Sequence, residues 1–136
     1  MKQYKNILVY KNLFKKKFGV KSDVVFGLRK PKKTLRGRYN FDKDIIVIYH
    51  SDNMLRTFIH ELTHAYQKKY MSNLMKLEEI YRNTTNDEYY YRPIEQHARL
   101  VAESISKYLE KNGIDSIVDI DIKATMHKLE KKVILY

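Results

Sequence analysis

Cysteine is absent from this chain of 136 residues, which excludes a disulfide framework and any metal site built on thiolates. Metal ligands would therefore have to be histidines or carboxylates. Tryptophan is absent as well, and the aromatic residues are mostly tyrosine, with 12 Tyr against 5 Phe. No internal repeat or low-complexity linker is present, and the only prolines are Pro31 and Pro93.

Long apolar runs are also missing. No stretch of about 18 apolar residues occurs, and the first residues, MKQYKNILVYKNLFKKKFG, are too charged and too short in apolar length for a secretory signal. We therefore expect a soluble, cytoplasmic protein that does not enter a membrane. The length suits a single domain, residues 1–136, with one hydrophobic core.

Acidic residues are scarce in the first third. Residues 1–43 contain 14 Lys and Arg against 2 Asp and Glu, a net charge of +12, whereas residues 44–136 contain 13 against 14, a net charge of −1. Such asymmetry is typical of a surface for nucleic acid or an acidic partner, and equally of a lysine-rich, solvated surface. The nucleic-acid interpretation assigns phosphate contacts to Lys32, Lys33, Arg36 and Arg38.

Apolar spacing predicts a helix and then strands in the first 50 residues. Residues 4–18 have helical periodicity, and Gly19 is placed to end that helix. The segments 23–28, 34–41 and 45–50 are predicted strands separated by short turns, which indicates a small antiparallel or mixed sheet. The last of them, IIVIYH, is apolar enough to be buried on both faces.

Helical spacing returns at about Ser51, where Ser51 or Asp52 could cap the helix. Its apolar stripe consists of Leu55, Phe58, Ile59, Leu62 and Tyr66. Within 71–92, NLMKLEEIY could be helical and RNTTNDEYYY a loop, and a longer helix is predicted from Pro93 to Gly113. In the tail, IVDIDI alternates like a strand, but we prefer a final helix with apolar positions Ile122, Met126, Leu129 and Val133. These elements predict an α+β fold.

The segment FIHELTHAYQ, residues 58–67, contains the HExxH pattern. Positions four apart on a helix share one face, so His60 and His64 could bind one ion. Zinc accepts neutral imidazoles and lowers the pKa of bound water, and Glu61 could remove the proton as that water attacks a carbonyl. The alternative is an ordinary amphipathic helix with incidental histidines, but the preceding buried strand and an available third ligand favour the metal site.

A third ligand must come from a later segment. The available side chains are Asp87, Glu88, Glu95 and His97. Glu95 lies in the first turn of a predicted helix, and the small Ala98 would let that helix approach closely, so Glu95 is preferred. His97 remains an alternative, whereas His50 and His127 are interpreted as incidental.

The segments HELTHAYQ and YRPIEQHA resemble small zincin-type metallopeptidases of bacterial and phage origin, over about residues 34–105. HExxH with a downstream glutamate is the gluzincin pattern, found in minimal form in ImmA/IrrE-like domains. HELTHAY is also similar to SprT-like proteases, which usually use a third histidine, here His97. Where larger gluzincins have an acidic residue four positions after the glutamate ligand, this chain has Arg99.

The resemblance implies that His60, His64 and Glu95 bind zinc and that Glu61 is the general base. It also implies a short sheet packed on the HExxH helix, whose edge strand, GRYNF, could pair with an extended peptide. Such enzymes often stabilise the oxyanion with a tyrosine or histidine. Tyr91 is predicted for that role, beside Tyr89 and Tyr90, although these tyrosines could equally pack against the sheet.

Three functions follow as hypotheses. The first is a zinc-dependent endopeptidase that cleaves a protein or peptide substrate inside a bacterium or a phage-infected cell. The second is a DNA-associated protein, either a SprT-like protease or a non-catalytic nucleic-acid binder that uses the basic first third. The third is a zincin fold retained for binding, which the presence of Glu61 argues against.

Overall fold

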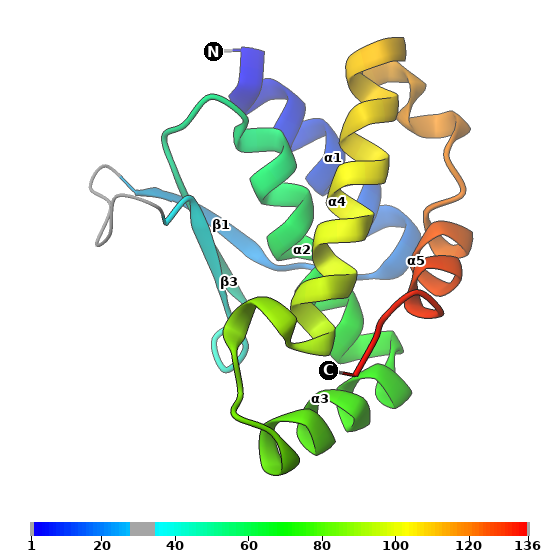
Figure 1. The fold of residues 1–136 in the computed structure, drawn as a ribbon. Coiled ribbons are helices and arrows are strands. Elements are labelled where there is room, and N and C mark those ends of the chain that lie inside the picture. The colour runs from blue at the N-terminus through cyan, green and yellow to red at the C-terminus, as the bar shows by residue number, and fades with distance from the viewer. Residues whose placement is uncertain (1, 28–34, 136) are drawn as a thin grey trace.

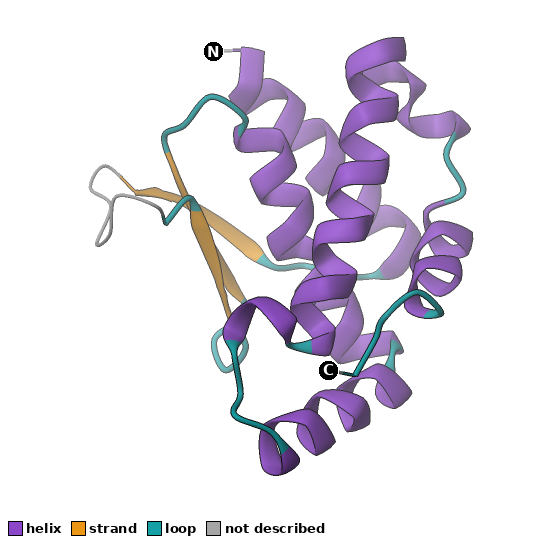
Figure 2. Ribbon diagram, in the orientation of Figure 1, coloured by secondary structure: helices purple, strands orange, loops and turns teal. Residues whose placement is uncertain are grey.

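The computed structural model describes residues 2–27 and 35–135. Within these residues the elements are, in order, α1 (Lys2–Phe18), β1 (Asp23–Gly27), β2 (Gly37–Asn40), β3 (Ile45–Tyr49), α2 (Met54–Tyr70), α3 (Ser72–Thr84), η1 (Tyr89–Tyr91), α4 (Pro93–Asn112), η2 (Ile114–Asp119) and α5 (Ile122–Glu130). Helices and a small sheet occupy separate layers, with the helices on one side of the sheet (Figure 2), so the α+β prediction is confirmed.

The sheet has the order β1-β3-β2, with β3 in the centre. It is mixed, because β3 runs parallel to β1 and antiparallel to β2. Ile46 and Ile48 are fully buried against the helices, whereas Val25, which pairs with Val47 on the opposite face, is 50% exposed. Ile45 and Val47 are only partly buried and His50 is exposed, so the expected burial of 45–50 on both faces is wrong for part of the outer face. The outer ends of the other two predicted strands, Leu28 and Thr34, lie outside the described residues.

Helix α1 follows its prediction and ends at Gly19, which has a positive φ of 66°. Ile7, Tyr10 and Phe14 are buried and lie at helical spacing, so α1 covers α2 with an aromatic face. Leu8 is 49% exposed and does not take part in this face.

Helix α2 lies between the sheet and α4 and forms the centre of the fold (Figure 1). It begins later than predicted. The cap is Asn53 rather than Ser51 or Asp52, and the Asn53 side chain accepts a hydrogen bond of 3.1 Å from the Arg56 N–H. Since Met54 is the first helical residue and is buried, the residue directly before it takes the capping position.

Helix α4 begins at Pro93 and ends at Gly113 as predicted, and it makes the most extensive helix contact with α2. Ala98 is fully buried, in agreement with the expected close approach. After α4 the chain forms η2 and then α5, so the preferred final helix is confirmed and a strand at IVDIDI is wrong. Burial of Ile122 and Met126 explains this choice, although α5 ends before Val133.

Candidate metal centre

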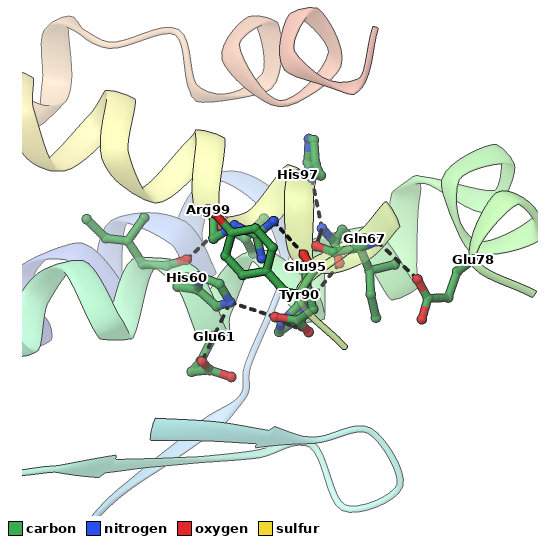
Figure 3. A network of polar contacts seen from close by, with 12 residues as sticks. His60, Glu61, Gln67, Glu78, Tyr90, Glu95, His97 and Arg99 are labelled. Carbon is green, nitrogen blue, oxygen red and sulfur yellow. Dashed lines mark hydrogen bonds and ion pairs between the residues drawn. The ribbon is translucent and has the colours of Figure 1, made fainter. Parts of the chain in front are cut away.

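The structure brings together the three residues that the sequence predicted as ligands. His60 and His64 lie one turn apart on α2, and Glu95 lies in the first turn of α4. One potential ligand atom from each of the three lies within 4.8 Å of the others. His64 and Glu95 are buried, and the His60 side chain is 19% exposed, so the cluster opens to solvent on one side. Figure 3 shows His60 and Glu95 facing each other across the two helices.

The Glu95 carboxylate bridges the two imidazoles. Its Oε1 lies 2.9 Å from His60 Nε2, and its Oε2 lies 3.0 Å from His64 Nε2. Burial alone would raise the pKa of Glu95, but its contacts with His60 and His64 outweigh burial and hold that pKa far below its usual range. The carboxylate is therefore ionised and available to a cation.

A second layer of hydrogen bonds determines which nitrogen of His64 faces the cluster. His97 Nε2 lies 2.7 Å from the Met126 carbonyl oxygen, which can only accept, so this nitrogen carries the proton and His97 Nδ1 is an acceptor. Gln67 Nε2 donates to His97 Nδ1 at 2.8 Å and to the Ile94 carbonyl at 3.0 Å. Gln67 Oε1 then accepts from His64 Nδ1 at 2.9 Å.

Because these hydrogen bonds place the proton of a neutral His64 ring on Nδ1, His64 Nε2 carries a lone pair. That atom is buried and has no well-directed hydrogen bond, although a Glu95 oxygen lies 3.0 Å away. Two lone pairs at this distance repel unless a proton or a metal ion lies between them. Burial disfavours the charged imidazole, but the Glu95 carboxylate outweighs burial and raises the pKa of His64 to about 9. The residues thus fit a metal cation, with two imidazoles and one carboxylate as its donors.

His97 is not placed to be a ligand. Both of its ring nitrogens are engaged, one by Gln67 and one by the Met126 carbonyl. Burial lowers the pKa of His97 to about 4, which keeps the ring neutral and suited to this supporting role. Among the other side chains considered, Asp87 forms a two-fold hydrogen-bonded ion pair with Arg92, at 2.7 and 2.9 Å.

Glu61 lies beside the cluster without joining it. Its Oε2 is 3.9 Å from His60 Nε2, and its carboxylate accepts a hydrogen bond from the backbone N–H of Tyr39 on β2. Burial raises the pKa of Glu61, with a smaller contribution of the same sign from Glu95, and the two histidines act against both. A carboxylate with a raised pKa next to a cation site is suited to accept a proton and pass it on.

Gln67 and Glu78 are site residues that sequence reasoning did not identify. Helix α4 lacks a capping side chain of its own, and the Ile94 N–H instead donates to buried Glu78 of α3 at 3.2 Å. Glu78 thereby supports the turn that carries Glu95. The position of Gln67 three residues after His64 was a usable signal, whereas α3 gave no indication of where Glu78 would point.

Among the three tyrosines of η1, the one that reaches the cluster is Tyr89. Tyr89 as a whole is 62% exposed, but its hydroxyl is hydrogen-bonded to the Glu95 carboxylate, and partial burial together with the carboxylates of Glu95 and Glu61 raises the pKa of Tyr89. Tyr91, predicted for the oxyanion, lines cavities on other sides of η1 and neither of the two that border Glu61. A 3₁₀ turn rotates successive side chains by about 120°, which separates Tyr89 from Tyr91.

Two cavities meet at the cluster, because both have Glu61, Tyr89 and Glu95 in their walls. The first, about 530 Å³, extends along the N-terminal half of α2 and includes Gly37. The second, about 440 Å³, extends past Phe41 towards α3. The two together form a cleft across the site, with β2 along one side.

The predicted nucleic-acid contacts are only partly within the described structure. Lys32 and Lys33 lie outside the described residues. Arg36 and Arg38 are exposed, and Arg36 lines the first cavity while Arg38 lines the second.

Comparisons with family models, with curated proteins and with solved structures gave no match. The candidate site is therefore supported by its own geometry and by the HELTH motif. In the described part of the chain, no helix is long and apolar enough to cross a membrane.

Proposed function

We propose that this protein is a zinc-dependent endopeptidase with a zincin-like fold. The observation that carries the proposal is the buried Nε2 of His64, which faces the Glu95 carboxylate at 3.0 Å without a well-directed hydrogen bond. Nitrogen and oxygen lone pairs that converge in a buried place need a proton or a metal ion between them, and the second imidazole on the same carboxylate favours a metal ion. The cytoplasmic location and the protein or peptide substrate expected from the sequence are parts of the same proposal.

Zinc is the metal that this donor set favours. Two imidazoles and one carboxylate are the protein ligands of many catalytic zinc sites, which keep a further position for water or substrate. The partial exposure of His60 and the adjoining cleft supply access to such a position. When bound, zinc would polarise the substrate carbonyl and acidify water at neutral pH.

Glu61 is the general base in this proposal. It lies on the cleft side of His60 and, held by the Tyr39 N–H, points to the space in front of the cluster. From there its carboxylate takes the proton of the attacking water and delivers it to the leaving amine. Tyr89, through its hydroxyl, takes the role of oxyanion stabiliser that the sequence assigned to Tyr91.

The edge strand β2 supplies a way to hold an extended peptide. The Tyr49 N–H donates to the Arg36 carbonyl, so every second residue from Arg36 onwards bonds to β3. Gly37 and Tyr39 lie between these residues, and their backbone groups do not bond to β3. The backbone groups of Gly37 and Tyr39 therefore face the cleft, where Tyr39 already reaches Glu61. A substrate strand added here would pass directly in front of the cluster.

The experiment that tests the proposal combines elemental analysis with peptide hydrolysis. Purified protein is expected to contain close to one zinc per chain, Glu95→Ala is expected to lose it, and Glu61→Gln is expected to keep the metal but lose hydrolysis by about 10²- to 10⁴-fold. His97→Ala serves as a second comparison, because it is expected to weaken metal binding without abolishing it. Protein that holds no zinc after reconstitution, or full hydrolysis by Glu61→Gln, would contradict the proposal.

A further inference from the structure

Three arginines line the first cavity, and each comes from a different part of the fold. Arg36 directly precedes β2, Arg56 lies in the first turn of α2, and Arg99 lies on α4 one turn after Glu95. Segments that are distant in sequence thus place three guanidinium groups around one cavity of about 530 Å³. Two carboxylates, Glu61 and Glu95, line the same cavity, so the three arginines leave it with an excess of positive charge that favours a negative partner.

Within the described residues, none of these three arginines forms an ion pair. Arg99 donates to the Tyr90 carbonyl at 2.6 Å, and its guanidinium lies 3.8 Å from the centre of the Tyr90 ring (Figure 3). These contacts orient the guanidinium without neutralising it. Glu103 forms its ion pair with Lys107 at 2.8 Å, and its electrostatic interaction with Arg56 contributes less than Lys107 to lowering the pKa of Glu103.

The second cavity differs from the first in that two of its arginines form ion pairs and its wall includes apolar side chains. Arg82 and Arg92 in its wall are paired with Asp87, at 3.7 and 2.7 Å. Its other lining side chains include the apolar Phe41 and Met75. Arg38 also lines the second cavity and forms no ion pair among the described residues. The cleft therefore has three arginines without an ion pair at one end, and one such arginine beside paired charges and apolar side chains at the other.

We propose that the first cavity is a specificity pocket for an acidic side chain of the substrate, an aspartate or glutamate next to the scissile bond. This inference rests on the proposed peptidase function. Arginine is well suited to the task, since its planar guanidinium binds a carboxylate through two parallel hydrogen bonds. The occupant is a peptide rather than nucleic acid, because a chain of successive phosphates would also have to pass the carboxylates of Glu61 and Glu95.

The position of the acidic residue relative to the scissile bond follows from β2. The first cavity lies at the Gly37 end of the strand, and the second lies at the Tyr39 and Phe41 end. An antiparallel peptide, the more stable pairing, places its C-terminal part beside Gly37. The acidic residue is therefore the one that follows the scissile bond, and the residue that precedes it is large and apolar.

The test uses the zinc-loaded full chain with short peptide libraries, in which the residues around each cleaved bond are read by mass spectrometry. Peptides with Asp or Glu after the scissile bond are then compared with the same peptides carrying Asn or Gln. We expect the acidic peptides to have a kcat/KM about tenfold higher. Arg99→Gln, which removes the charge but retains an amide donor, is expected to abolish most of that preference, as is Arg56→Gln. Lys111→Gln removes the same charge from the exposed last turn of α4, outside the cavity, and should leave the preference unchanged.

Binding of the same peptide pairs to zinc-loaded Glu61→Gln separates this inference from the proposed function. Cleavage that depends on Glu61 but is equal for acidic and amide peptides, or that prefers the acidic residue before the scissile bond, would overturn the inference and leave the peptidase function standing. Tighter binding of acidic peptides, with no cleavage by the wild-type protein, would contradict the peptidase function and leave the recognition of an acidic side chain by the first cavity standing. If the protein shows neither cleavage nor preferential binding of acidic peptides, both the inference and the proposed peptidase function are overturned. Displacement of the acidic peptide by an equal concentration of single-stranded oligonucleotide would also overturn the inference.

Discussion

The α2–α4 helix pair and the N-terminal third of the chain are both rich in ionisable groups, but they hold them in opposite ways. Between α2 and α4, His64, Glu95 and His97 are at most 4% exposed and contact one another or shared partners. In the N-terminal third, side chains such as Lys15 and Lys16 are exposed at the end of α1.

The ionisable groups between α2 and α4 are informative about function because they are buried. Removing a carboxylate from water costs several kcal/mol unless a partner compensates for it, whereas an exposed lysine costs almost nothing. The buried groups form an ordered arrangement that ends at an atom without a well-directed hydrogen bond, His64 Nε2. The exposed lysines are compatible with many surfaces, so their number alone does not define a partner.

The largest effect on the buried cluster is expected from removal of the Glu95 carboxylate. Glu95→Gln is expected to abolish zinc binding and with it the increase in unfolding free energy that the metal supplies, about 3 kcal/mol at a zinc concentration one hundred times the Kd. Thermal unfolding with and without zinc measures this. The variant should unfold at the same temperature in both conditions, and an undiminished zinc-dependent shift would show that Glu95 is not a ligand.

A smaller effect is expected from the supporting layer. Gln67→Leu removes the hydrogen bonds to His64 and His97 and should weaken zinc affinity by about 10- to 100-fold, as measured by competition with a chelator. The matched control is Gln96→Leu, which also removes a buried amide, one that bonds to Tyr91 and Ile134 instead. Equal losses of affinity in both variants would mean that the layer acts only through stability.

The distance between β2 and α2 can be tested through Gly37. A Cβ at this position would lie 2.7 Å from Thr57 Cγ2 and 3.0 Å from the Val47 carbonyl oxygen. Gly37→Ala is therefore expected to lower the unfolding free energy by about 1–3 kcal/mol, measured by urea denaturation. Adding Thr57→Ser, which removes the closest methyl group, should restore part of the loss. No loss in the single variant would contradict the close approach.

The smallest effect is expected from the basic surface. Replacing Lys15, Lys16 and Lys17 with Gln removes favourable charges from the last turn of α1 and should lower the unfolding free energy by no more than about 1 kcal/mol in total. Zinc content and peptide hydrolysis should not change. Fluorescence anisotropy with duplex and single-stranded DNA, at several salt concentrations, tests the nucleic-acid hypothesis on the same variant. A steep salt dependence that the triple variant reduces would support it.

Much of the local structure could be predicted because it depends on short-range chemistry. Glycines end α1 and α4, Pro93 begins α4, and apolar spacing distinguishes the helices from the strands. The same is true of the ligand motif, since helix geometry alone places His60 and His64 on one face. Cap positions were less predictable, as Asn53 illustrates, because burial of the first helical turn decided among several polar residues.

The sequence by itself determined the ligand types, their spacing on α2 and the preference for Glu95 over His97. Only the tertiary structure decided what surrounds them. Packing of α5 on α4 brings the Met126 carbonyl to His97, and that contact determines the hydrogen bonds of Gln67 and His64. The fold likewise gathers three arginines from separate segments around one cavity. Such arrangements depend on contacts between residues far apart in the chain, which no local pattern of residues encodes.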